Sequence, residues 1–310
     1  MALAGSRSNS AFLAYGATAR KWTSRVADYV ALTKPRIIEL LLITTLPAML
    51  LARRSVPSGW LVLSTLAGGA LAAAGANAAN MFVDRDIDKL MERTRRRPLA
   101  AGTVAPGAAI ALAVLLEVAA VAVLWIAANL LSAAIALAAA LFYVFVYTAW
   151  LKRSSAQNIV IGGAAGAAPA LVGWVAVTGK VAWAPAIMCV IVFLWTPPHF
   201  WSLAVRYKDD YHAAGVPMLP AVASLKKTGQ EIVLYSALTC ITSLALAPVA
   251  NMGPIYVIAA VLLGGVLMAC SLNFARNHSA KSAMHLFHWS IIYLTLLFLA
   301  IAVDAVVRFR

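Results

Sequence analysis

Nine long apolar stretches constrain this 310-residue chain more than any other feature. Each has about the 20 residues that an α-helix needs to cross the hydrocarbon core of a bilayer. Only helices and closed barrels satisfy every backbone hydrogen bond in lipid. The pattern therefore predicts an all-α, polytopic membrane protein with nine transmembrane helices, at residues 35–53, 60–83, 108–128, 130–150, 159–178, 182–205, 232–250, 254–275 and 286–307.

Composition excludes a water-soluble fold, because 63% of the residues are hydrophobic and only 12% are charged. Short polar joints between the stretches favour one membrane domain over residues 31–310, after a cytoplasmic N-terminal tail at residues 1–30. The tail contains Arg and Ser, which fits a bacterial cytoplasmic tail and also resembles a transit peptide. We therefore expect the bacterial inner membrane, with the mitochondrial inner membrane as the alternative.

The distribution of basic residues predicts the orientation of the chain. With the N-terminus and every second loop in the cytoplasm, only five of the 25 Lys and Arg residues lie on the other side: Arg53, Arg54, Lys180, Arg308 and Arg310. This strong positive-inside bias predicts a cytoplasmic N-terminus. The net charge of +14 is then mostly a consequence of topology, and it does not indicate nucleic-acid binding.

A group of acidic residues directly follows the second apolar stretch. Asn80, Asp84 and Asp88 are spaced four residues apart, so they share one face of a helix, and Asp86 points elsewhere. Carboxylate and amide oxygens suit Mg²⁺, and a polar residue inside an apolar span is a functional candidate. The spacing predicts a catalytic metal site, although a solvated helix end with internal ion pairs is the other interpretation.

Basic residues accompany the acidic face. Arg93 and Arg97 follow it in the same loop, and Lys152 and Arg153 lie in the next cytoplasmic loop. Guanidinium forks and ammonium groups are the usual ligands of phosphate oxygens. We predict that these four side chains bind a diphosphate.

The same residues carry a family resemblance. Asn80-xxx-Asp84-xxx-Asp88, followed by Arg93-Thr94 and Arg97-Pro98-Leu99, resembles the first signature of the intramembrane UbiA-like prenyltransferases. Three further stretches resemble the heme O synthase branch of that family. These are LTKPR at 32–36, YTAWLKRSSAQNIVIGGAAGAAPALVGW at 147–174 and WTPPHFWSLAVRYKDDYHAAGVPMLP at 195–220. The resemblance implies nine helices around a central cavity in the lipid, with farnesyl diphosphate, heme b and Mg²⁺ as ligands.

The second acidic motif departs from the family pattern. Many relatives carry DxxxD there, whereas this chain has Asp209 and Asp210, and we expect Asp210 to complete the metal site. His199 follows Pro197 and Pro198, where we expect a broken helix. In an enzyme that handles heme we predict that His199 is a catalytic residue that contacts the porphyrin, with hydrogen-bonded packing as the alternative.

Several residues within the spans have a lower rank. Glu39 and Glu117 are secondary functional candidates, because an intramembrane carboxylate is costly unless it is satisfied or neutral. Gly162, Gly163 and Gly166 form a small-residue stripe that we assign to close helix packing.

The resemblance implies a Mg²⁺-dependent transfer of a farnesyl group to a vinyl group of heme b, which makes heme O. A heme A synthase is the expected partner. A prenyltransferase for a quinone precursor or a chlorophyll-type acceptor is one alternative, but it should carry an intact second DxxxD. A non-enzymatic heme transporter or chaperone is another, for which we would expect internal repeats.

Overall fold

The computed structural model describes residues 25–308, except for the side chains at positions 36, 37 and 39–42. Within this range every regular element is a helix, which confirms the all-α prediction. Most of the predicted tail, residues 1–24, lies outside the described residues. The long helices are α2 (Pro35–Arg53), α3 (Gly59–Val83), α6 (Pro106–Ala127), α7 (Leu130–Leu141), α9 (Asn158–Thr178), α10 (Trp183–Arg206), α13 (Leu225–Ala250), α14 (Pro254–Asn277) and α15 (Ala280–Arg308).

Eight helical segments of the described chain are long and apolar enough to cross a membrane, and they coincide with eight predicted spans. One of them, Leu130–Ser154, joins α7 to the π-helix η1 (Phe142–Leu151) and to α8 (Lys152–Ser154). The remaining prediction coincides with α2, whose described apolar part, Ile43–Arg53, is shorter than a full span. The count of nine spans and the cytoplasmic N-terminus therefore stay predictions.

Two helices begin before the apolar stretches that predicted them. Helix α13 begins at Leu225 rather than at 232, because the Ser224 hydroxyl accepts a hydrogen bond from the Lys227 amide at 3.2 Å. Lys227 also pairs with Glu231 at 2.7 Å. Helix α15 similarly begins at Ala280 rather than at 286. Hydropathy marks the lipid-embedded part of a helix, and polar caps and ion pairs extend the helix into the interface.

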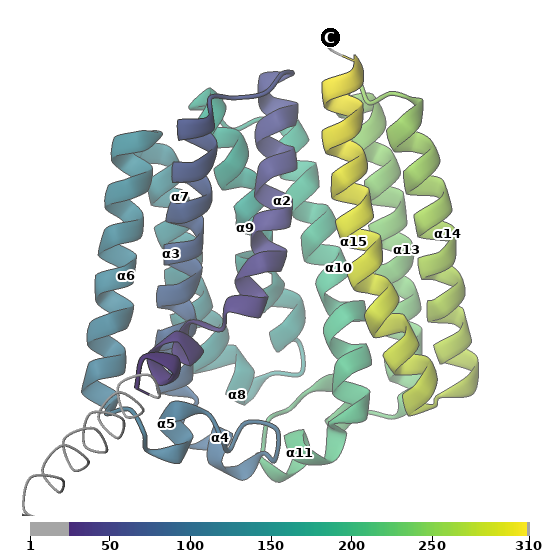
Figure 1. Cartoon of the computed structure of the whole chain (residues 1–310). Helices are drawn as coiled ribbons and strands as arrows, with labels where there is room; N and C mark the ends of the chain where they lie inside the picture. The colour runs from purple at the N-terminus through teal and green to yellow at the C-terminus, as the bar shows by residue number, and fades with distance from the viewer. Residues whose placement is uncertain (1–24, 309–310) are drawn as a thin grey trace, which may run out of the picture.

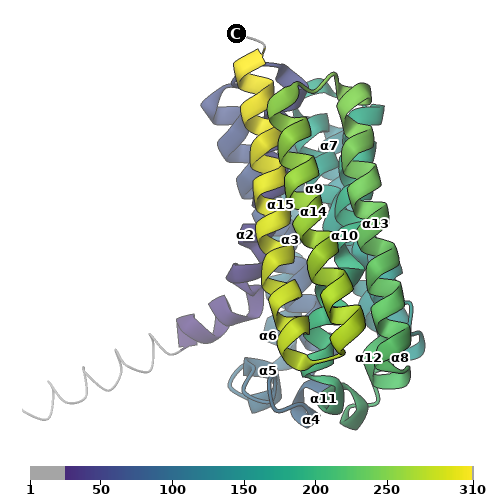
Figure 2. The same ribbon diagram turned by 90° about the vertical axis from the view of Figure 1, so that its right-hand side faces the viewer.

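The helices form a closed ring in which each long helix packs against the next in the chain and α15 packs against α2 (Figures 1 and 2). The largest apolar core joins α10 to its neighbours α9, α13 and α15. Fully buried side chains such as Met188, Leu246 and Leu297 fill this core. The core between the helices also holds polar side chains that bond to one another, such as Ser243 with Tyr293 at 2.8 Å.

Helix α10 passes through Pro197 and Pro198 without interruption, so the predicted break is wrong. Each proline removes one backbone donor, but hydroxyls and packed neighbours can satisfy the affected turns of a membrane helix. Thr196 donates to the Val192 carbonyl and Ser202 to the His199 carbonyl, each at 2.8 Å. These bonds lie in the turns next to the prolines, and the helix continues to Arg206.

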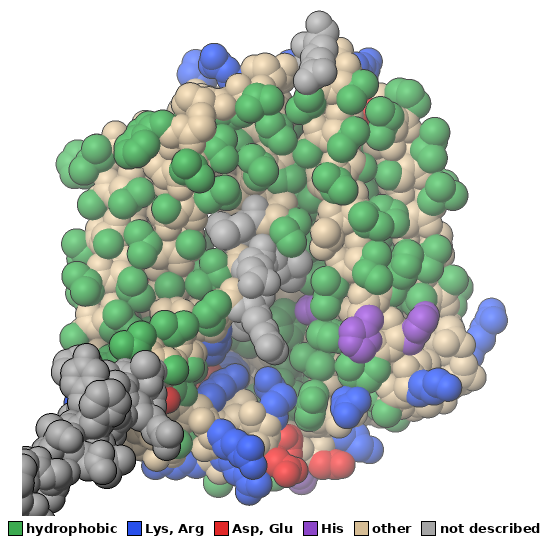
Figure 3. All heavy atoms as spheres, in the orientation of Figure 1, with side chains coloured by type: hydrophobic (Ala, Val, Ile, Leu, Met, Phe, Trp, Pro, Cys, Tyr) green, Lys and Arg blue, Asp and Glu red, His purple; other side chains and the backbone are tan. Residues whose placement is uncertain are grey.

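Charged side chains gather at one end of the ring. Figure 3 shows hydrophobic side chains over the middle of the visible face, and most Lys, Arg, Asp and Glu at the end opposite the C-terminus. Four short helices lie at this end: α4 (Ile87–Leu90), α5 (Pro98–Ala101), α11 (Lys208–Ala213) and α12 (Leu219–Val222). The acidic and basic group of the sequence lies among them.

Candidate active site

The end of α3 places Asn80, Asp84 and Asp88. Helix α3 ends at Val83 and a turn leads into α4, so the three residues do not share one regular helix. Helix-like hydrogen bonds nevertheless cross this turn, from the Asp84 amide to the Asn80 carbonyl at 2.9 Å and from the Asp88 amide to the Asp84 carbonyl at 2.8 Å. All three side chains are buried, whereas the side chain of Asp86 is 60% exposed.

The Asp84 carboxylate is the most enclosed acid of the site. Its Oδ2 accepts hydrogen bonds from Asn80 Nδ2 at 3.0 Å and from Lys152 Nζ at 2.5 Å. Its Oδ1 is buried and has no hydrogen-bond partner within the described part of the chain. A buried carboxylate oxygen without a partner is costly, so this atom is a candidate ligand for a cation.

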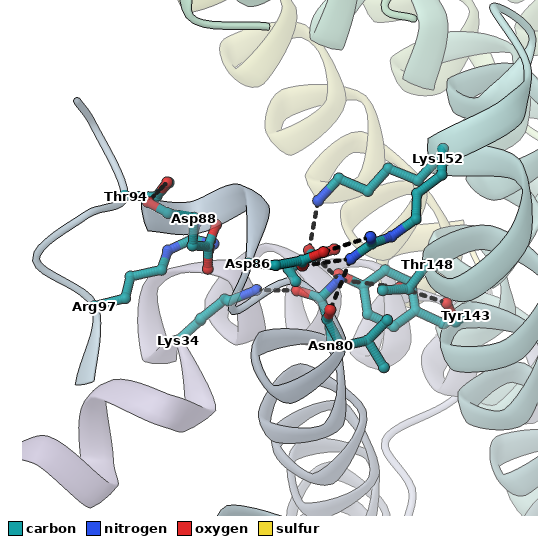
Figure 4. Close-up of polar contacts among 12 residues, drawn as sticks. Lys34, Asn80, Asp86, Asp88, Thr94, Arg97, Tyr143, Thr148 and Lys152 are labelled. Atoms are coloured by element: carbon teal, nitrogen blue, oxygen red, sulfur yellow. Dashed lines mark hydrogen bonds and ion pairs between the residues drawn. The ribbon is translucent and has the colours of Figure 1, made fainter. Parts of the chain in front are cut away.

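Lys34 belongs to the site, and the sequence analysis noted it only as part of LTKPR. It stands immediately before α2 with a left-handed φ of 51°, and its Nζ donates to Asn80 Oδ1 at 2.5 Å (Figure 4). Burial lowers the pKa of Lys34 to about 7, and the positive charges of Arg97 and Lys152 act in the same direction. The sequence does contain one indication that Lys34 has a role, because this lysine lies directly before the proline that starts an apolar span.

Asp88 pairs with Arg97 beside this group (Figure 4). Arg97 Nη1 lies 2.9 Å from both carboxylate oxygens, and the Thr94 hydroxyl donates to the Asp88 carbonyl at 3.0 Å. Arg97 directly precedes α5, so the loop after α4 folds back and returns the guanidinium to the acid. The two predicted signature elements, the acidic face and the arginine group, therefore touch.

Two other predicted phosphate ligands have contacts outside the Asp84 cluster. Arg153 donates to both Asp86 oxygens at 2.6 and 2.7 Å, and this hydrogen bonding holds the pKa of Asp86 well below its usual range. Arg93 lies over the Tyr207 ring, 5.4 Å from the ring centroid. The arrangement leaves Lys34, Arg97 and Lys152 as the cations in contact with the buried polar cluster.

The site holds two balanced ion pairs beside a third basic side chain. Arg97 and Lys152 pair with the carboxylates of Asp88 and Asp84, and a bound anion would favour the charged form of Lys34, whose pKa burial lowers to about 7. The same cluster presents two carboxylates and the Asn80 carboxamide, which are hard oxygen ligands. Together with the unpartnered Asp84 Oδ1, this donor set fits a divalent cation bound along with a phosphate anion.

Within the described residues, Asp210 and His199 make no hydrogen bond or ion pair with Asn80, Asp84 or Asp88. Asp210 lies on α11, and the described residues contain no group of three or more His, Cys, Asp or Glu side chains that could hold a metal. His199 is buried in α10, with Nδ1 2.8 Å from the Ser290 hydroxyl. Its ring stacks against Trp195 and Phe287, with centroid distances of 4.3 and 4.7 Å. These contacts fix the orientation of the imidazole ring.

The secondary candidates and the glycine stripe differ in their surroundings. The side chain of Glu39 lies outside the described residues, and Glu117 on α6 faces Gly75 of α3. A Cβ at Gly162 would lie 2.2 Å from the Tyr147 ring, and a Cβ at Gly163 would lie 3.0 Å from Thr196. These two glycines permit close helix packing as predicted, whereas Gly166 faces open space, so its assignment to packing is wrong.

Comparison with known proteins identifies the class. The model of the UbiA prenyltransferase family matches residues 41–299. The chain therefore belongs to this family.

Curated relatives with about half of their residues identical to this chain belong to one branch of the family. The chain is 51% identical over 284 residues to the protoheme IX farnesyltransferase of Clavibacter sepedonicus, covering 91% of this chain and 93% of the relative. It is 53% identical over 285 residues to protoheme IX farnesyltransferase 1 of Saccharopolyspora erythraea, covering 91% of each. The relatives thus agree with the branch that the sequence motifs indicate.

Solved structures share the fold at low sequence identity. A structure of digeranylgeranylglyceryl phosphate synthase superposes with a TM-score of 0.74 at 18% identity, covering 91% of this chain and 99% of the other. A UbiA homologue from Archaeoglobus fulgidus, bound to DMAPP and Mg²⁺, has a TM-score of 0.65 at 18% identity, covering 90% and 99%. The arrangement of helices is therefore that of the family.

Proposed function

We propose that this protein transfers the farnesyl group of farnesyl diphosphate to a vinyl group of heme b, with Mg²⁺ as cofactor, to make heme O. The observation that carries the proposal is the buried cluster of Asn80, Asp84 and Asp88, in contact with cations, at the polar end of a UbiA fold. The choice of heme as acceptor is supported by the curated relatives that share about half of the residues over most of the chain.

Asn80, Asp84 and Asp88 would hold the metal, and Arg97, Lys152 and Lys34 would bind the diphosphate oxygens. Bound Mg²⁺ would supply electrostatic stabilisation of the negative charge on the departing diphosphate. The cationic side chains act in the same direction, because fixed charges in a site shielded from water stabilise developing charge strongly. Arg93, Arg153 and Asp210 would act from the rim of the site, where the substrate enters.

The reaction breaks the bond between farnesyl C1 and oxygen, and diphosphate leaves with the electron pair. The heme vinyl group then forms a carbon–carbon bond to C1. Water adds to the resulting cation and releases one proton, which leaves a hydroxyethylfarnesyl substituent. Early entry of water would hydrolyse the donor, so the transfer requires that water be kept from farnesyl C1 until the carbon–carbon bond has formed.

His199 is the proposed contact to heme, in the second half of α10. Its stacked contacts with Trp195 and Phe287 supply aromatic surface beside which a porphyrin would lie. The product, heme O, would pass to a heme A synthase. We place the protein in the bacterial inner membrane with a cytoplasmic N-terminus, the tail at 1–30 preceding the membrane domain at 31–310, because the basic residues favour this orientation.

Product analysis tests the proposal. Purified protein is given heme b, Mg²⁺ and farnesyl diphosphate, and the porphyrins are examined by mass spectrometry. We expect one product that carries a farnesyl group and one hydroxyl group derived from water. Prenylation of a phenolic quinone precursor in a parallel reaction, with heme unchanged, would instead assign the protein to a different acceptor. Heme binding without either product would favour a transporter or chaperone.

A further inference from the structure

The Asn80 carboxamide is held by a residue outside the predicted site. Asn80 Nδ2 donates to Asp84 Oδ2 and to the Thr148 hydroxyl, both at 3.0 Å. A carboxamide nitrogen carries two hydrogens, and both are therefore used. The Asn80 Oδ1 is left to face the cations, where Lys34 now contacts it. Figure 4 shows Thr148 next to Asn80 on the side away from Lys34.

The Thr148 hydroxyl can distinguish the two ends of this amide. A hydroxyl has one hydrogen, and Thr148 donates it to the Tyr143 carbonyl at 2.8 Å. While this bond is kept, only the lone pairs of the hydroxyl oxygen remain, so the oxygen accepts from an N–H. A flipped Asn80 would lose its hydrogen bond to the Asp84 carboxylate, and it would gain one from Thr148 only if that hydroxyl gave up the Tyr143 carbonyl. The oriented hydroxyl thus selects the conformation with Oδ1 toward the site.

The π-helix η1 explains why Thr148 lies there. In an α-helix a threonine hydroxyl bonds back to the carbonyl three or four residues earlier, whereas Thr148 reaches five residues back to Tyr143. Such i→i+5 geometry is rare and is frequently found at functional sites. Close packing fixes η1, because the Tyr147 ring occupies the space over Gly162 of α9. Helix α9 therefore holds η1 in place through this contact between Tyr147 and Gly162.

We infer that Thr148 is a positioning residue that locks the Asn80 carboxamide with Oδ1 directed at the bound metal. This inference rests on the proposed function, because it assigns a role to Asn80 as a ligand. The prediction is specific to the hydroxyl. Thr148→Ser keeps it, whereas Thr148→Val keeps the shape and removes it.

Metal binding measured without turnover tests the inference. Mn²⁺ is titrated by electron paramagnetic resonance, as a probe of the Mg²⁺ site, into protein that holds an unreactive thiolo analogue of farnesyl diphosphate. Groups that orient a metal ligand typically contribute roughly 10- to 100-fold in metal affinity. We expect Thr148→Val to weaken Mn²⁺ binding by about that factor. Thr148→Ser should stay within about threefold of the wild type, and the Mg²⁺ concentration for half-maximal turnover should follow the same order.

Thr239→Val is the matched control, because Thr239 is also a buried helical threonine whose hydroxyl bonds to a carbonyl, that of Tyr235, away from the site. It should bind Mn²⁺ like the wild type. If Thr148→Val does not fold, Thr148→Ala replaces it, because alanine also lacks the hydroxyl and has a smaller side chain; we expect the same loss of Mn²⁺ affinity. Equal Mn²⁺ affinity of the wild type and the hydroxyl-free variant would overturn the inference while the proposed function stands. Failure of the wild type to bind Mn²⁺ would overturn both.

Discussion

At the scale of single residues, the sequence predicts site residues where several polar side chains recur at a regular spacing. Asn80, Asp84 and Asp88 were found because four-residue steps align them, and the structure buries all three. Lys34 and Thr148 are single polar residues from other segments, 46 and 68 positions from Asn80 in the chain. No local pattern predicts such contacts, because they depend on how α2 and η1 pack against the end of α3.

Lys34 provides the residue-scale prediction. Replacing it by methionine removes a cation next to Asn80 while keeping an unbranched side chain. A hydrogen bond to a charged group contributes about 1.5–3 kcal/mol, so we expect KM for farnesyl diphosphate to rise roughly 10- to 100-fold. Steady-state kinetics at saturating heme measures it.

Lys89→Met is the control, since Lys89 is an exposed lysine on α4. It should leave KM within about twofold of the wild type, as expected for a screened surface charge. An equal rise in KM for both variants would mean that general surface charge, rather than the contact with Asn80, attracts the substrate.

At the scale of elements, hydropathy predicted where the helices lie but not their irregularities. The expected break at Pro197–Pro198 is absent, and η1, which nothing in its apolar sequence indicated, is a π-helix. Both results depend on neighbours. The α10 prolines lie in a helix that packs against α9, α13 and α15. In η1, the Tyr147 ring occupies the space that the missing side chain of Gly162 leaves on α9.

Gly162 tests this account of η1. Gly162→Ala places a methyl group 2.2 Å from the Tyr147 ring, so the ring or the helix must move. Overpacking of this kind costs about 1–3 kcal/mol, and we expect a lower thermal unfolding midpoint together with reduced turnover. Gly166→Ala meets nothing within 4 Å and should leave both quantities nearly unchanged. Wild-type stability and turnover of Gly162→Ala would show that η1 does not depend on this contact.

At the scale of the whole molecule, the class and its membrane location followed from composition and from the length of the apolar stretches. The packing of α15 against α2 could not be predicted in this way, because hydropathy does not specify which helices are neighbours. Orientation is the prediction that belongs here. Nine spans place the two termini on opposite sides of the membrane, and eight would place them on the same side.

Reporter fusions measure the orientation. We expect a fluorescent protein joined to the N-terminus to be cytoplasmic, and alkaline phosphatase joined to the C-terminus to be active on the other side. Both termini on the same side would show that α2 does not cross the membrane as a separate span.

The central claim is that the buried face at the end of α3, and not the acidic run as a whole, carries the metal-dependent transfer. The pair Asp84→Asn and Asp86→Asn tests it most directly, because the first side chain is buried among cations and the second is exposed and paired with Arg153. Both variants are assayed for farnesylated heme by mass spectrometry at saturating Mg²⁺. We predict that Asp84→Asn folds but forms no product, and that Asp86→Asn keeps most of the wild-type rate. Product formation by Asp84→Asn at the wild-type rate would contradict the account.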